Sequence, residues 1–132
     1  MTGLDTNVVV RFLAGDHPAQ SAAARALFAA LTPEAPGFIA RETMVEIHWV
    51  LSRAYGLDRA AVCDALEGLA LSRELAVEAA DDVLAAVAAA RAGAGDFADL
   101  MIAAAGRRAG CVRTLTFDRR AARAEGMALL GE

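Results

Sequence analysis

Short apolar segments alternate with longer amphipathic segments along the whole chain, and turn residues separate them. Short apolar runs bounded by Gly, Pro or Asp are typical of β-strands, and longer segments with a helical period are typical of α-helices. The predicted strands lie at 1–4, 37–40, 73–78, 112–117 and 127–130. The predicted helices lie at 6–13, 17–31, 41–55, 58–69, 79–92, 96–109 and 119–125.

The clearest helix predictions rest on apolar residues that recur every three or four positions, which predicts one buried stripe on each helix. In 41–55 this stripe consists of Ile47, Val50, Leu51, Ala54 and Tyr55. In 96–109 it consists of Phe97, Leu100, Met101, Ala104 and Ala105. Gly56 and Gly110 are expected to end these two helices, because Gly is common just after a helix.

Strands that alternate with helices predict a parallel sheet covered by helices on both faces, which is a three-layer α/β/α arrangement. The chain has 132 residues, of which 57% are hydrophobic, and it contains no linker or repeat. This length and composition predict a single domain, 1–132, with a packed core.

Five acidic residues lie at predicted strand ends, at a helix start or beside a buried helix stripe. Asp5 and Asp118 each follow a predicted strand and precede a helix, and Asp96 and Asp99 stand three apart at a helix start. Glu46 is next to the buried stripe of its helix, and we expect it to lie against the protein body. Ligands bind at the carboxyl ends of strands in α/β sheets, so these carboxylates are expected to share one pocket.

Carboxylates that lie so close together need a positive counter-charge. A hard cation that prefers oxygen ligands, Mg²⁺ or Mn²⁺, suits a cluster without His or Cys. Each residue also has a simpler interpretation. Asp5, Asp96 and Asp118 are good helix N-caps, and Glu46 is acceptable on a solvated helix face. The joint pattern favours the metal site.

Composition excludes several other classes of protein. All 13 basic residues other than His are Arg, so mechanisms that need a Lys are excluded. The two His residues have no ligand-like spacing, and Cys63 and Cys111 are predicted to be buried, unpaired side chains. No apolar run approaches the roughly 18 residues that span a bilayer, and no secretory signal is visible. We therefore expect a cytoplasmic protein without a membrane segment.

Arginines gather near the end of a chain whose net charge is −4. Residues 106–123 contain six Arg and one Asp, a net charge of +5. Arg119 and Arg120 directly follow Asp118, so they are candidates for holding RNA phosphates beside the acidic pocket. A solvated helix face is the alternative interpretation.

Four segments together resemble the PIN domain, and in particular the toxin nucleases of VapBC-type toxin–antitoxin pairs. They are DTNVVVRFL at 5–13, ETMVEIHWVLSRAYGL at 42–57, DFADLMIAAAGRRAG at 96–110 and LTFDRR at 115–120. The resemblance covers essentially the whole chain in the family's order. It implies a sandwich of helices around a parallel sheet and a metal-dependent endoribonuclease, active with one or two Mg²⁺ or Mn²⁺ ions.

The resemblance also implies roles for individual residues. The family's main acids fall on Asp5, Glu46, Asp99 and Asp118, and Asp96 matches an accessory acidic position. Thr6 and Thr116 match polar positions that line the pocket, although ordinary structural hydroxyls are the alternative. An RNA substrate, a cognate antitoxin protein and a homodimer are the implied partners. Exposed apolar residues are then expected on the first helices, with Phe12, Leu13 and Phe28 as candidates.

Three rival classes use similar features. An aspartate-nucleophile phosphatase needs a second Asp two residues after Asp5, where this chain has Asn7, and it also needs a Lys. A phospho-receiver domain likewise relies on a Lys. A non-catalytic PIN-like RNA-binding module would not need the full acidic set.

Overall fold

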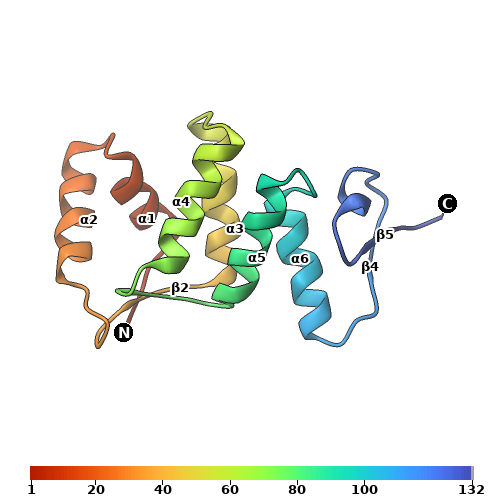
Figure 1. Ribbon diagram of the computed structural model, residues 1–132. Coiled ribbons are helices and arrows are strands. Elements are labelled where there is room, and N and C mark those ends of the chain that lie inside the picture. Colours follow the sequence, from red (N-terminus) through yellow and green to blue (C-terminus); the bar gives the residue numbers. More distant parts are fainter. Residues whose placement is uncertain (132) are drawn as a thin grey trace. The chain divides into compact units, whose positions relative to one another are not determined.

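The computed structural model describes residues 1–131, so residue 132, the last of the predicted domain, lies outside the described residues. The chain forms two compact units, Met1–Ala80 and the part from Asp81 onward. Each unit contains helices and one parallel sheet. Figure 1 colours these elements along the sequence, from red at the N-terminus to blue at the C-terminus.

The first unit is built on three short parallel strands with the order β1-β2-β3: β1 Thr2–Gly3, β2 Gly37–Ile39 and β3 Leu75–Val77. Its helices are α1 Thr6–Ala14, α2 Pro18–Ala30, α3 Arg41–Trp49 and α4 Arg59–Leu71. Helix α1 contacts α2 and α3, and α4 contacts α3 and β3. The largest fully buried side chains here include Val9, Ile39, Met44, Ile47 and Leu66.

Local sequence explains where these helices begin and end. Asp58 caps α4, and its carboxylate accepts the Ala61 N–H at 2.9 Å. His17 caps α2, whose first residue is Pro18, a residue suited to the first helical position. Gly15 follows α1 with φ +66°, a left-handed conformation that favours glycine.

The predicted helix 41–55 is correct in extent but changes type within it. After α3 the chain continues as one π-helical turn, η1 Val50–Ala54, in which the Tyr55 N–H reaches back to the Val50 carbonyl at 3.2 Å. The wider turn rotates the following residues away from the predicted stripe. Met44, Ile47 and Leu51 are buried, but Ala54 is exposed.

The second unit contains α5 Ala80–Arg91 at the boundary, α6 Phe97–Arg108, the 3₁₀ turn η2 Ala121–Arg123 and a parallel pair of strands. The strands are β4 Thr114–Thr116 and β5 Met127–Leu129, with Thr114 opposite Met127. The predicted stripe of α6 is buried except for Ala105, which is half-buried. Every described strand pairing in the chain is parallel, as the alternation of elements predicts.

Two predictions near the C-terminus were too long. The strand expected at 112–117 is limited to β4, because Val112 and Phe117 are 95% and 80% exposed and make no ladder. The helix expected at 119–125 is a single 3₁₀ turn, which Ala124 ends by returning to extended backbone. Cys63 is buried as predicted, whereas Cys111 is exposed, and both are free thiols.

Candidate functional site

Asp5 occupies the link between strand β1 and helix α1. Its backbone is extended, with φ −83° and ψ 163°, and its Oδ1 accepts the Thr6 N–H at 2.8 Å. The capping interpretation of Asp5 is therefore correct. A carboxylate has a second oxygen with further lone pairs, so a cap bond made by Oδ1 is compatible with ligand binding by Oδ2.

Thr6 connects Asp5 to Glu46. The Thr6 side chain is 7% exposed, and its Oγ1 donates a hydrogen bond to Glu46 Oε1. This contact joins the first turn of α1 to the middle of α3. Asp5, Thr6 and Glu46 are thus joined by two hydrogen bonds within the first unit.

One detail of the Glu46 prediction is wrong. Glu46 is exposed, and it does not lie against the protein body as a whole. The buried side of this helix consists of Met44, Ile47 and Leu51, and Glu46 does not lie on that side. Only the end of the Glu46 side chain turns back, toward the buried Thr6 hydroxyl.

Three aspartates of the second unit influence one another electrostatically. Asp99 lies in the first turn of α6 and is half-buried. Burial raises the pKa of the Asp99 carboxyl above its usual range, and the charges of Asp96 and Asp118 raise this pKa further. A raised pKa means that the ionised Asp99 lacks sufficient positive charge or donors nearby.

Asp96 serves as an N-cap, as its simpler interpretation predicted, whereas Asp118 lies before the N-cap of η2, which is Arg120. Asp96 Oδ1 accepts the Ala98 N–H at 3.1 Å at the start of α6. Asp118 Oδ1 accepts the N–H groups of Arg120 and Ala121 at 2.8 and 3.3 Å. Thr116 Oγ1 accepts the Asp118 N–H at 3.0 Å, so the threonine at the end of β4 fixes the backbone that presents this carboxylate.

The arginine-rich segment divides into two groups. Arg107 donates to the Glu125 carbonyl at 3.0 Å, and Arg108 forms an ion pair with Asp82 at 2.5 Å that raises the pKa of its guanidinium. These two arginines therefore bind parts of their own unit. Arg119 and Arg120 are exposed directly after Asp118, and Arg123 is exposed at the end of η2.

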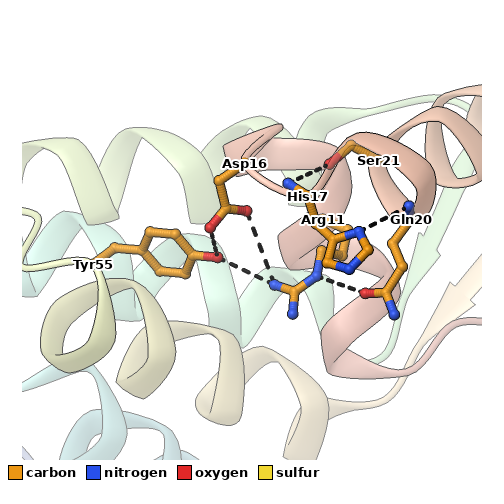
Figure 2. A network of polar contacts seen from close by, with 6 residues as sticks. All are labelled: Arg11, Asp16, His17, Gln20, Ser21 and Tyr55. Atoms are coloured by element: carbon orange, nitrogen blue, oxygen red, sulfur yellow. Dashed lines mark hydrogen bonds and ion pairs between the residues drawn. The ribbon is translucent and has the colours of Figure 1, made fainter.

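A polar network that the sequence did not reveal joins α1 and α2 to the residue after η1 (Figure 2). Arg11 donates from Nε to Gln20 Oε1 at 2.8 Å and from Nη1 to the Tyr55 hydroxyl at 3.2 Å. The Tyr55 hydroxyl donates to Asp16 at 2.9 Å, and this bond is the main reason that the pKa of Tyr55 is raised. The partners of Arg11 stand up to 44 residues away in sequence, so no local pattern predicts them.

Arg11 and Gln20 also line an open cavity of about 290 Å³ between α1 and α2, together with Asn7, Val8, Ala23, Ala24 and Leu27.

The apolar residues predicted to be exposed for a protein partner lie on the same two helices. Phe12 and Leu13 are exposed as predicted, whereas Phe28 is half-buried. The Phe12 and Phe28 rings stack with their centroids 3.9 Å apart.

The predicted acidic set is thus divided between the units, with Asp5 and Glu46 in the first and Asp96, Asp99 and Asp118 in the second. Across residues 1–131, no three His, Cys, Asp or Glu side chains are gathered closely enough to hold a metal ion. The chemistry of the donors nevertheless fits a hard cation, because carboxylate oxygens are the ligands that such a cation prefers.

Parallel strands joined by helices, with aspartates after β1 and β4, define an α/β protein whose polar residues stand at the carboxyl ends of its strands. A model of the PIN domain family matches residues 4–127. The chain therefore belongs to the PIN domain family, which confirms the predicted three-layer α/β/α fold class. The PIN domain is generally a nuclease fold that binds RNA and typically uses divalent metal ions.

Searches among curated proteins and among solved structures gave no significant match. No helix within residues 1–131 is long and apolar enough to cross a membrane.

Proposed function

We propose that this chain is a Mg²⁺- or Mn²⁺-dependent endoribonuclease that hydrolyses RNA phosphodiester bonds, with 1–132 acting as one nuclease domain. The observation that carries the proposal is the half-buried Asp99 of a PIN domain chain, whose pKa is raised by burial and by the charges of two further carboxylates, Asp96 and Asp118. An uncompensated cluster of acids costs stability, and a site that must bind a cation accounts for this cost.

Asp5, Glu46 and Asp99 are the proposed main ligands of the cation. Asp118 is assigned either to the same role or to orienting a water, and Asp96 to supporting the other ligands. When bound, the cation supplies Lewis-acid stabilisation of the charge on the phosphoryl oxygens and a more acidic water. One or two ions are compatible with this set of donors.

Neighbouring side chains orient these ligands. The Thr6 hydroxyl holds Glu46 by one oxygen, and the Thr6 N–H holds Asp5 by one oxygen. Thr116 fixes the backbone at Asp118. Arg119 and Arg120 are proposed to bind RNA phosphates, because an acidic site repels RNA and needs cationic side chains close to it.

The experiment that tests the activity is cleavage of a mixed pool of RNA by the purified full chain. Cleavage is expected with Mg²⁺ or Mn²⁺, and EDTA should abolish it. The Asp99→Asn chain, purified in parallel, controls for contaminating nucleases. Equal cleavage by both chains, or no cleavage with either metal, would contradict the proposal.

We further propose that the chain is the toxin of a type II toxin–antitoxin pair, acting in the cytoplasm as a homodimer that a cognate antitoxin inhibits. The stacked Phe12 and Phe28 and the exposed Leu13 support a protein-binding surface on α1 and α2. Light scattering should give twice the mass of the chain. A monomer at high concentration would contradict the homodimer, and the absence of a small DNA-binding protein in the neighbouring reading frame would contradict the toxin role.

A further inference from the structure

Trp49 and Arg53 form an exposed aromatic–cation pair at the end of α3. The guanidinium carbon of Arg53 lies 3.9 Å from the centroid of the Trp49 ring, and Trp49 is 36% exposed. Trp49 is the last residue of α3, and Arg53 belongs to the π-helical turn that follows. A guanidinium over an indole face orders both side chains while leaving both in contact with solvent.

This pair lies next to a proposed metal ligand. Glu46 precedes Trp49 by three residues, so both side chains project from the same side of α3. At a rise of about 1.5 Å per residue, the two positions are separated by about 4.5 Å along the helix axis. The pair therefore extends the surface of α3 one turn beyond the Glu46 carboxylate.

Trp49 and Arg53 are not among the buried core residues of the chain. Met44, Ile47 and Leu51 bury the other side of the same helix. Replacing Trp49 should therefore leave the fold intact, and this makes the role of the side chain testable by mutation.

We propose that Trp49 and Arg53 form a stacking platform that binds an unpaired base of the RNA beside Glu46. The inference rests on the proposed nuclease function and adds to it two residues that hold an unpaired base. Aromatic rings and guanidinium planes both stack on nucleobases, and sequence-tolerant binding of single strands commonly uses them. Arg53 also offers N–H donors to the adjacent phosphate, which the indole alone lacks.

RNA is favoured over a second copy of the chain as the ligand of this pair, because a fixed positive charge next to an aromatic face suits a polyanion with exposed π-faces. Homodimer contacts would be expected to cover Trp49 without any nucleic acid. Measuring Trp49 fluorescence without RNA at different protein concentrations therefore distinguishes a second copy of the chain from RNA.

Trp49 is the only tryptophan of the chain, so its fluorescence reports directly on the platform. The inactive Asp99→Asn chain in Mg²⁺ should lose fluorescence in a saturable manner when a single-stranded RNA is added, because base stacking quenches indole emission. A fully paired RNA should quench much less. An oligonucleotide of equal length and charge without bases should bind through its phosphates but leave the emission unchanged.

Binding of labelled RNA, measured by anisotropy in the same background, tests the contribution to affinity. Trp49→Ala should weaken binding by roughly 10-fold, whereas Trp49→Phe should retain most of it. Leu71→Ala, which removes another exposed large apolar side chain of the first unit, is the matched control and should change nothing. Circular dichroism should show that all three variants are folded.

Three results would overturn the platform: equal quenching by the base-free oligonucleotide, bound RNA that leaves the emission unchanged, or an emission that depends on protein concentration without RNA. The last result would assign Trp49 to contact with a second copy. Cleavage by the wild-type chain is scored separately, so a chain that binds and stacks RNA without cutting it would contradict only the nuclease proposal.

Discussion

The two units of this protein carry similar carboxylates in different surroundings. In the first unit, Asp5 and Glu46 each accept a hydrogen bond from Thr6, one from its N–H and one from its hydroxyl. In the second unit, burial and the charges of Asp96 and Asp118 raise the pKa of Asp99. Asp5 and Glu46 thus each share a donor residue, Thr6, whereas burial and like charges oppose the ionisation of Asp99.

This difference predicts different responses of these carboxylates to a bound cation. Carboxylates held by donors have defined orientations, which suits ligands that must be in place before a cation arrives. A carboxylate that is opposed by like charge gains most when a cation arrives, because the cation replaces repulsion by attraction. We therefore expect the variants of the second unit to affect metal binding most and those of the first to affect local order.

The largest effect is expected for the activity of Asp99→Asn. Loss of this charged oxygen donor should lower RNA cleavage by at least about 100-fold, the scale seen when one electrostatic contact of a catalytic site is removed. Gel-based cleavage rates in Mg²⁺ are the measurement. Asp5→Asn should behave similarly, and Glu125→Gln, an exposed acid of the second unit, should cleave at the wild-type rate. Normal cleavage by Asp99→Asn would contradict the role of Asp99 as a ligand of the cation.

An intermediate effect is expected for RNA binding by the arginines of the second unit. The Arg119→Ala and Arg120→Ala double change should reduce the slope of log K against log salt concentration by about 1.4, the value for two lost contacts to single-strand phosphates. Affinity is measured at two salt concentrations in the Asp99→Asn background. The matched control removes two exposed arginines of the first unit, Arg25 and Arg59. An unchanged slope would mean that Arg119 and Arg120 are only solvated.

The fold class was predictable because its signal is local and repeated. Apolar segments with two different periods give the α/β class, and acids at predicted helix starts give the caps at Asp5 and Asp96. The π-helical turn η1 was not predictable, because its apolar residues also fit an α-helix and only the i to i−5 bond distinguishes the two. Likewise, Phe117 is a residue type that is common in strands, but here it is exposed and has no partner strand.

The candidate site was predictable in its residue types and less so in its contacts. Positions after strands identified the aspartates, but the bond from Thr6 to Glu46 spans 40 residues and depends on how α1 packs against α3. The Arg11 network escaped prediction for the same reason (Figure 2). Trp49 was missed because a single aromatic residue in an apolar helix is normally part of a core.

A smaller effect is expected for the hydrogen bond in the first unit. Thr6→Val keeps the shape of a buried side chain but removes the donor to Glu46, so the free energy of unfolding should fall by about 1 kcal/mol. Thermal unfolding of the metal-free chain measures this change. Thr6→Ser retains the hydroxyl and should lose less, and Thr2→Val, at an exposed position of β1, should be neutral. If Thr6→Val is also neutral, the donor does not hold Glu46.

The smallest effect is the most direct comparison of the two units, namely the stability of metal-free Asp99→Asn as a function of pH. Because the folded state raises the pKa of Asp99, the folded chain binds this proton more tightly than the unfolded chain does. The wild-type Asp99 therefore destabilises the fold least below the ordinary pKa of Asp, and the folded chain loses stability as the pH rises through the raised pKa.

At neutral pH, Asp99→Asn should be more stable than the wild type by less than about 1 kcal/mol, since the site is partly solvated, and in acid this gain in stability should vanish. Urea unfolding at acidic and neutral pH measures both values, with Glu125→Gln as the control. Adding Mg²⁺ should reverse the order, because only the wild-type chain gains stability by binding the cation. A gain that persists in acid would show that the repulsion around Asp99 is not its cause.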